Sequence, residues 1–319
     1  MLFLNRATIS KVDASVIQDA VSSAYGRVLD QNFNMPDRMH VGDGENMLLL
    51  MPCFSQDYFA TKLVSVFPGA AELGEPAVNG VVVLSDNRSG KPLAFMDGAA
   101  LTAERTGAVG GLGVAHLTPL DLETAGIFGA GVQGFSQARY LLNNRKIKSL
   151  KIFDLYPEAA ESMAGRLMEQ YPELSVQVAG SAESLVAESQ LIIAATTSHE
   201  PLFADDAELV RGKTFISIGS FRPDMKEFPD AVIKGADRVY ADTPFAAKES
   251  GDLSIPLGRG VVPADKIQPF AQLLKRSLPV QAGEALFFKS VGMALFDLTT
   301  AEKIFKDCLK NNWGQTLDF

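Results

Sequence analysis

The sequence predicts an α/β protein that combines a doubly wound parallel sheet with a smaller mixed α+β domain. Three observations support this fold class. Strand-like and helix-like segments alternate over residues 119–289, short turn-bounded strands dominate residues 1–118, and a glycine-rich turn opens the alternating part. With 319 residues, 47% of them apolar, the chain is long enough for two domains. We expect one domain over residues 1–118, to which residues 290–319 return, and a second over residues 119–289.

The first 118 residues contain two predicted helices and several short strands. Apolar residues at helical spacing predict a helix over residues 12–31. Short apolar runs between turns predict strands at 46–51, 60–67, 80–84 and 93–95, in a mixed or antiparallel sheet. Residues 102–117 form a second predicted helix with Thr102 as its N-cap. Its glycines reduce helix stability, so we expect its backbone to approach another element closely. The apolar run at 48–51 is interpreted as a core strand rather than an interface.

Regular alternation of strands and helices begins after residue 118. Strands are predicted at 125–128, 150–154, 176–179, 191–195, 215–218 and 238–241, with helices at 135–142 and 157–170. Repeated units of this size are typical of a parallel sheet with helices on both faces. The segment 285–309 is strand-like and then helical. We expect it to rejoin the first domain, because the second domain is complete without it.

Composition excludes several classes of protein. The 29 basic and 38 acidic residues give a net charge of −9, which argues against nucleic-acid binding by general charge. Two cysteines exclude a disulfide scaffold and indicate a reducing compartment. The histidines and cysteines lack the spacing of a metal site. No apolar run approaches the roughly 20 residues of a membrane span, and the first residues do not resemble a signal peptide. We expect a soluble, cytoplasmic protein that acts on a small molecule.

The strongest motif is the glycine-rich turn at residues 129–134, which has the pattern GxGxxG. It follows an apolar strand and precedes a helix, so Gly129 and Gly131 permit close approach to a pyrophosphate at the helix N-terminus. Asp154 ends the next strand and can accept hydrogen bonds from both ribose hydroxyls. The pattern predicts a Rossmann domain that binds NAD(H), because Asp154 would repel the 2′-phosphate of NADP(H) and no cation follows it. NADP(H) remains an alternative, as does a turn without a ligand.

Polar and glycine residues follow two later strands of the same domain. Thr196, Thr197 and Ser198 come after one predicted strand, and the segment Gly219 to Pro223 comes after the next. Because open parallel sheets bind ligands beyond the carboxyl ends of their strands, we expect both segments to line the cofactor site.

Motifs spread over nearly the whole chain resemble those of the ornithine cyclodeaminase/mu-crystallin family. They are TKLVSVFP at 61–68, MDG at 96–98, LTAERT at 101–106, the turn at 129–134, ATTS at 195–198, GSFRPD at 219–224 with Glu227, and SVGMA at 290–294 with Asp297. The resemblance implies a nicotinamide-dependent homodimer. In each subunit, residues 1–118 would bind substrate and form the dimer, and residues 119–289 would bind NAD(P).

The resemblance also implies roles for individual residues. Arg38 and Lys62 would bind the substrate carboxylate, with Lys62 as the catalytic candidate. The implied cofactor contacts are Arg105 with the neighbouring Thr106 at the phosphates, Val132, Gln133 and Asp154 along the dinucleotide, and Thr196, Ser290 and Val291 near the ribose and nicotinamide. From the residues alone, three cations have simpler interpretations: Lys62 on the solvent face of its strand, Arg38 in a surface loop, and Arg105 as a solvated helix charge.

One residue separates the activities of the family. Phe221 stands where its cyclodeaminases carry an acidic acid/base residue, and phenylalanine cannot titrate. The sequence therefore favours reduction of a cyclic imino acid, Δ1-pyrroline-2-carboxylate to proline or Δ1-piperideine-2-carboxylate to pipecolate, with Phe221 packed on the substrate ring. The alternatives are an ornithine or lysine cyclodeaminase, an alanine-type amino-acid dehydrogenase, and a mu-crystallin-like ligand-binding protein.

Overall fold

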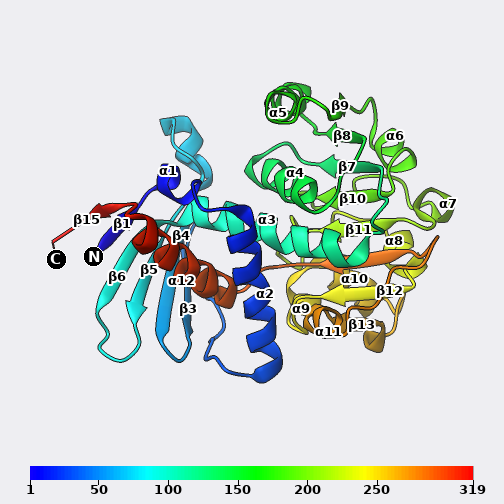
Figure 1. The fold of residues 1–319 in the computed structure, drawn as a ribbon. Helices are drawn as coiled ribbons and strands as arrows, with labels where there is room; N and C mark the ends of the chain where they lie inside the picture. The colour runs from blue at the N-terminus through cyan, green and yellow to red at the C-terminus, as the bar shows by residue number, and fades with distance from the viewer. Residues whose placement is uncertain (319) are drawn as a thin grey trace. The chain divides into compact units, whose positions relative to one another are not determined.

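The computed structural model describes residues 1–318, which form two compact units (Figure 1). Unit 1 comprises Met1–Ala108 and the residues from Gly292 onward, and unit 2 comprises Val109–Val291. The first division falls inside a helix, α3 (Gly98–Leu117), rather than in the following loop where the sequence pattern changes. No helix among the described residues is both long and apolar enough to cross a membrane.

Unit 1 is built on a mixed sheet with the strand order β15-β1-β6-β5-β4-β3-β2. Neighbouring strands from β2 to β6 are antiparallel, whereas β1 runs parallel to β6. The strands are β1 (Leu2–Leu4), β2 (Met39–Asp43), β3 (Asn46–Phe54), β4 (Tyr58–Val66), β5 (Val78–Asp86), β6 (Pro92–Asp97) and β15 (Gln315–Thr316). The predicted mixed sheet is thus confirmed. The run at 48–51 lies in β3, but only Met51 is buried, so its interpretation as a core strand is wrong for the other three residues.

Helices cover one face of this sheet. Besides the first half of α3, the helices of unit 1 are α1 (Arg6–Ile9), α2 (Ala14–Asp30) and α12 (Ala294–Asn311), with a 3-10 helix η1 at Pro68–Leu73. Helix α12 packs on α2 and on β3, β4 and β5. Because side chains alternate along a strand, Ala60 and Lys62 of β4 are buried on the covered face while Thr61 and Leu63 point the other way.

Helix α3 begins at Gly98, one turn earlier than the sequence indicated. The Asp97 side chain accepts a hydrogen bond from the Ala100 N–H at 2.8 Å, which serves the free end of the helix. The prediction of Thr102 as N-cap is therefore wrong, because the helix starts directly after β6. The close approach expected for the glycines is confirmed: a Cβ on Gly110 would lie 1.7 Å from Gln137 Oε1, and one on Gly113 would lie 2.9 Å from Phe288.

Unit 2 contains a parallel sheet with the strand order β13-β12-β14-β11-β10-β7-β8-β9. Its strands are β7 (Thr124–Phe128), β8 (Ser149–Phe153), β9 (Ser175–Val178), β10 (Leu191–Ala194), β11 (Thr214–Ser217), β12 (Arg238–Ala241), β13 (Ile267–Pro269) and β14 (Leu286–Lys289). The chain winds from β7 outward to β9 and then returns to β10 on the other side. This order confirms the doubly wound α/β fold and places the reversal of direction at β7.

The helices of unit 2 are short, and they pack on strands that carry apolar residues throughout. They are α4 (Val132–Asn144), α5 (Pro157–Gln170), α6 (Ala182–Ala187), α7 (Ala207–Val210), α8 (Asp230–Gly235), α9 (Ala246–Glu249), α10 (Gly251–Gly258) and α11 (Phe270–Arg276), with a 3-10 helix η2 at Ala264–Lys266. Every residue of β10, β11 and β14 is buried. Fully buried central strands of this kind require cover on both faces.

Candidate functional site

The glycine-rich turn joins β7 to α4 in unit 2. Gly129 has a φ of +92°, and a Cβ there would lie 2.7 Å from the Ala195 carbonyl oxygen. A Cβ on Gly134 would lie 1.8 Å from the Gly129 carbonyl oxygen. Neither position accepts a side chain without a backbone shift. The N-cap of α4 is Gly131, which has no side chain to occupy the first N–H groups of the helix. These N–H groups suit an anion such as a pyrophosphate.

Asp154 follows β8 directly and lies at the same turn. Its Oδ2 accepts a hydrogen bond from the Ala130 N–H at 2.7 Å, and its Oδ1 accepts one from the Tyr156 N–H at 2.9 Å. Nearby, the Oε1 atom of Gln133 is buried and has no hydrogen-bond partner among the described residues. A buried polar atom of this kind needs a partner. The turn, the carboxylate and this atom fit a bound dinucleotide.

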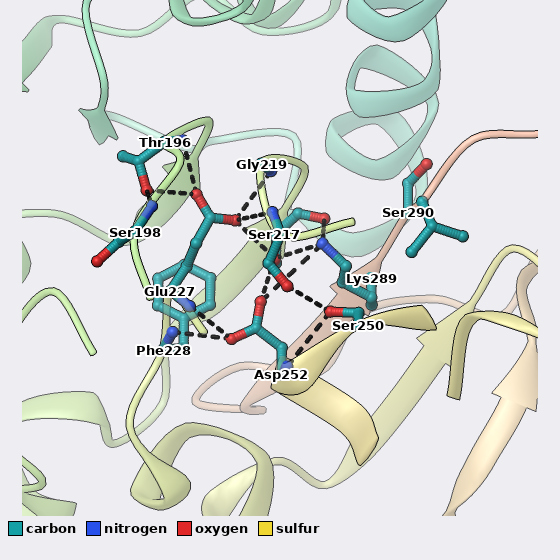
Figure 2. Close-up of polar contacts among 12 residues, drawn as sticks. Thr196, Ser198, Ser217, Gly219, Glu227, Phe228, Ser250, Asp252, Lys289 and Ser290 are labelled. Atoms are coloured by element: carbon teal, nitrogen blue, oxygen red, sulfur yellow. Dashed lines mark hydrogen bonds and ion pairs between the residues drawn. The ribbon is translucent and has the colours of Figure 1, made fainter. Parts of the chain in front are cut away.

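Glu227 joins the loops that follow β10 and β11 (Figure 2). Its Oε1 accepts hydrogen bonds from the Thr196 N–H at 2.7 Å and the Thr196 hydroxyl at 2.9 Å. Its Oε2 accepts from the N–H groups of Gly219 at 2.9 Å and Ser220 at 3.0 Å. The loops also touch directly, because a Cβ on Gly219 would lie 2.0 Å from the Thr196 carbonyl oxygen.

A second buried carboxylate holds the segment after β14. Asp242 Oδ2 accepts hydrogen bonds from the Ser290 hydroxyl at 2.6 Å and from the Val291 N–H at 3.0 Å. Every segment of unit 2 that the sequence assigned to the cofactor therefore follows the carboxyl end of a strand of this one sheet. The set comprises Gly129, Gly131, Val132, Gln133, Asp154, Thr196, Thr197, Gly219, Ser290 and Val291. Phe221 follows β11 and is 45% exposed.

Unit 1 contains a buried cluster of two cations and one carboxylate. Lys62 of β4, Arg105 of α3 and Asp297 of α12 are 3%, 7% and 1% exposed. The Lys62 Nζ lies 3.0 Å from Asp297 Oδ1 and 2.9 Å from Oδ2, and the Arg105 Nε lies 3.1 Å from Oδ1. One carboxylate thus serves two buried cations. Because buried charges are costly unless paired, this arrangement favours an additional anion.

Burial lowers the pKa of Lys62 from 10.5 to about 8, and the positive charges of Arg105 and Arg38 act in the same direction against the opposing carboxylate of Asp297. Arg38 donates a hydrogen bond from Nη2 to the Gly292 carbonyl oxygen at 3.0 Å. The positive charges of Arg105 and Arg38 thus both lower the pKa of Lys62. A Lys62 with this pKa is mostly protonated at neutral pH, yet it can release a proton.

The structure brings Arg105 together with Lys62, whereas the resemblance implied a place at the cofactor phosphates. Its neighbour Thr106 is buried in the same helix. The interpretation of Lys62 as a solvent-facing residue is wrong, since its side chain is on the covered face of the sheet. Sequence reasoning noted Asp297 and Glu227 only as parts of motifs and assigned them no role. For Asp297 the signal was an acidic residue inside the apolar stretch LFDL, whereas Glu227 follows a lysine in MKEFP and carried no such signal.

Comparison with known proteins extends these findings. The profile of the ornithine cyclodeaminase/mu-crystallin family matches residues 4–312. A Δ1-pyrroline-2-carboxylate reductase of Bacillus cereus is 30% identical over 283 residues, 86% of each chain. The ketimine reductase mu-crystallin of Rattus norvegicus is 30% identical over 83% of this chain and 82% of its own. Among solved structures, Thermococcus litoralis Δ1-pyrroline-2-carboxylate reductase in complex with NADH and L-proline has a TM-score of 0.92 and 28% identity, over 99% of this chain and 100% of that one.

Proposed function

Because this chain belongs to the ornithine cyclodeaminase/mu-crystallin family, we propose that it is an oxidoreductase that reduces a cyclic imino acid with a nicotinamide cofactor. The substrate is Δ1-pyrroline-2-carboxylate, which gives L-proline, and the six-membered Δ1-piperideine-2-carboxylate gives L-pipecolate in the same way. The observation that carries the assignment is the cluster of Lys62 and Arg105 on the single carboxylate of Asp297. The carboxylate of the substrate supplies the second anion that two buried cations require.

The residues of this chain perform the steps that surround hydride transfer. Arg105 and Lys62 bind the substrate carboxylate and fix the orientation of the ring, as charged groups do best in a site that excludes water. When bound, the nicotinamide supplies the hydride. The imine nitrogen takes up one proton, and Lys62 holds a proton at Nζ with a pKa of about 8, suited to donation near neutral pH. Proton and hydride together convert the C=N bond to the secondary amine.

The cofactor that we assign is NADH rather than NADPH. Asp154 is a carboxylate at the glycine-rich turn, where it would accept hydrogen bonds from ribose hydroxyls and repel a 2′-phosphate. The next two residues, Leu155 and Tyr156, are 83% and 67% exposed and carry no positive charge. NADPH is therefore the weaker substrate.

The cyclodeaminase alternative is disfavoured by the groups near Phe221. That residue carries no proton to exchange, so another acid would have to act as the base. Asp224 is the nearest candidate in sequence, but its carboxylate is half-exposed and paired with the Arg222 guanidinium at 2.8 Å. A solvent-exposed carboxylate that already pairs with a guanidinium is a poor candidate for the general base that deamination requires.

The enzyme is also proposed to form a homodimer through the uncovered face of the unit 1 sheet. Apolar side chains pair across adjacent strands on this face: Leu63 stands opposite Leu50 on one side and Val81 on the other, and Val83 stands opposite Phe95. All five are only partly buried. Partly exposed apolar rows of this kind are typical of an interface between copies.

The cellular setting follows from the same assignment. Cys53 and Cys308 are free thiols, which suits the reducing cytoplasm, and we place the enzyme there. Its product places it in the formation of proline.

The assay that tests the proposal is oxidation of NADH, and separately of NADPH, by the purified protein with Δ1-pyrroline-2-carboxylate. We expect rapid oxidation of NADH, slower oxidation of NADPH, and no ammonia from ornithine with NAD⁺. Lys62→Met should lower kcat/KM for the imine by about 10- to 100-fold, the loss of one hydrogen bond to a charged group. Asp297 keeps Arg105 as its partner in this variant, so the fold should persist.

The matched control is Lys148→Met, which removes an exposed lysine of unit 2. It should leave kcat/KM unchanged. Ammonia and proline from ornithine would overturn the assignment in favour of a cyclodeaminase.

A further inference from the structure

A second cluster of buried charges lies in unit 2, and the proposed chemistry does not account for it (Figure 2). Glu227, Asp252 and Lys289 are 0%, 3% and 0% exposed, and Ser217 between them is also fully buried. Burial of three ionisable groups costs free energy unless each is paired and hydrogen-bonded. The cluster lies at the carboxyl ends of β11 and β14 and beside the loop after β10. The loops that follow β10 and β11 are therefore what the cluster can hold in place.

The cluster is a connected set of hydrogen bonds. Asp252 Oδ1 accepts from the N–H groups of Glu227 at 2.8 Å and Phe228 at 3.0 Å, which fixes the backbone that carries Glu227. The Ser217 Oγ lies 2.9 Å from Glu227 Oε2 and 2.6 Å from Asp252 Oδ2. The Lys289 Nζ donates to the Ser217 Oγ at 2.9 Å and lies 4.0 Å from Asp252 Oδ2. The position of Glu227 is thus held from both its backbone and its side chain.

The carboxylate of Glu227 continues the pairing of two strands beyond the point where the sheet ends. The ladder between β10 and β11 ends at the pair Ala194 and Ser217. The Ile218 N–H still donates to the Ala194 carbonyl oxygen at 2.8 Å, and beyond it the N–H groups of Thr196 and Gly219 both donate to Glu227. Because Oε1 serves one loop and Oε2 the other, this single side chain sets the separation of the two loops.

The ionisation of Glu227 has opposing causes. Burial, together with the neighbouring Asp252 carboxylate, raises the pKa of Glu227 above its ordinary value, whereas Lys289, the Thr196 N–H and the Ser217 hydroxyl favour the charged form. Two donors reach Oε1 and three reach Oε2, and both oxygens therefore act as acceptors. A side chain at position 227 that carried a hydrogen-bond donor in place of either oxygen would therefore repel the N–H groups of one of the two loops.

We propose that Glu227 is a positioning residue for the nicotinamide half of the cofactor. Its carboxylate holds the loops at Thr196–Thr197 and Gly219–Ser220 in the one arrangement in which they bind the nicotinamide and its ribose. The inference rests on the proposed function, which places a nicotinamide cofactor at this edge of the sheet. The adenosine half is bound independently, at the turn of Gly129 to Gly134 and at Asp154.

The test compares two ligands that share the adenosine half. Wild type and Glu227→Gln are titrated with NADH and with ADP-ribose, which lacks the nicotinamide, by calorimetry without any imine. Glutamine turns an N–H group toward one pair of donors. The dissociation constant for NADH should rise by about tenfold or more, as for the loss of a hydrogen bond to a charged group, and that for ADP-ribose should change by less than about twofold. In the assay, KM for NADH should rise while KM for the imine stays constant.

Two further variants make the result decisive. Glu284→Gln alters a partly buried carboxylate of the same unit that pairs with Arg238, and it should leave both dissociation constants unchanged. If Glu227→Gln does not fold, Ser217→Ala removes the hydroxyl that links Glu227 to Asp252 and should weaken NADH selectively, by about threefold.

The positioning role would be overturned if, in the folded variant, the dissociation constants for both ligands rose by the same factor or neither changed. Failure of wild type to bind either ligand would instead contradict the proposed function.

Discussion

Lys62 acquires its chemistry from its place in a sheet. Its neighbours along β4 alternate between the two faces, and the alternation turns its ammonium group to the side covered by α12, where Asp297 lies. A lysine in such a place is costly unless it is paired, and Arg105 already shares its partner. The same burial lowers its pKa to about 8, at which an ammonium group can release a proton near neutral pH.

The pH dependence of catalysis follows from that pKa. Burial lowers the pKa of Lys62 to about 8, so in free enzyme the ammonium loses its proton as the pH rises through that value. We expect kcat/KM for Δ1-pyrroline-2-carboxylate to fall above about pH 8, approaching a tenfold loss per pH unit. Inhibition by L-proline, whose carboxylate stays ionised and whose amine stays protonated over this range, should weaken in parallel. A flat profile to about pH 10 for both measurements would contradict a binding role for Lys62.

The effect on stability has the opposite sign. The folded-state pKa of Lys62 lies below the unfolded value of 10.5, so the unfolded chain binds the additional proton between the two values. The cost of burying a charged Lys62 is therefore fully present below about pH 8 and declines from there to about pH 10.5. Loss of activity on the alkaline side cannot then be attributed to unfolding caused by this residue.

Single residues were predicted from sequence where their signal was local or their type unusual. Lys62 stood out because it is a cation inside an apolar run. Asp154 stood out because it is an acidic residue at the end of a predicted strand. Asp297 could not be paired with Lys62 from sequence, since 235 residues separate them and neither segment contains a pattern that points to the other. Glu227 was missed for the same reason: its donors come from loops that only the sheet brings together.

At the scale of elements, the turn between β7 and α4 was predictable because its requirements are contained in six consecutive residues. Gly129 needs a positive φ, and Gly134 lies against the Gly129 carbonyl oxygen. The strands that sequence analysis missed are β1, β2, β13 and β15, which are two to five residues long. β1, β13 and β15 have at most three residues and β2 (MHVGD) contains no apolar run, so they become strands only because a neighbouring strand pairs with them.

A pair of Gly→Ala substitutions distinguishes the cost of a steric clash in this turn from the higher helix propensity of alanine. Gly134→Ala places a Cβ 1.8 Å from the Gly129 carbonyl oxygen, which forces the backbone to move. We expect it to lower the free energy of unfolding by about 1–3 kcal/mol and to weaken NADH binding. The control is Gly165→Ala in α5, where a Cβ meets nothing within 4 Å. It should raise stability by about 0.5–1 kcal/mol, measured by urea denaturation. Equal stability of the two variants would show that the close contact is not limiting.

At the scale of the whole molecule, the sequence predicted an α/β fold class and the family, and both are confirmed by the two sheets and by the match over residues 4–312. Motifs distributed along the chain made this possible. Which apolar residues lie on the surface was harder to predict from the sequence. The run at 48–51 is apolar in sequence, but whether its side chains face a core depends on which face of β3 the helices cover.

The uncovered face of the unit 1 sheet leads to a prediction about assembly. Leu63→Lys places a charge in the middle of its apolar rows, and we expect this variant to be monomeric where the wild type is dimeric. Light scattering coupled to size-exclusion chromatography measures the mass directly. Leu309→Lys, at an exposed position of α12, is the matched control and should remain dimeric. A wild-type monomer, or a dimeric Leu63→Lys variant, would remove this face from consideration as the interface.

The central claim is hydride transfer to the carbon of a cyclic imine, and isotope transfer measures it most directly. The enzyme is incubated with Δ1-pyrroline-2-carboxylate and NADH carrying deuterium at both C4 positions of the nicotinamide, and the product is examined by mass spectrometry and NMR. We expect L-proline that is heavier by one deuterium, with the label at Cα. Proline without the label, or no proline while NADH-dependent chemistry proceeds on another amino acid, would contradict it.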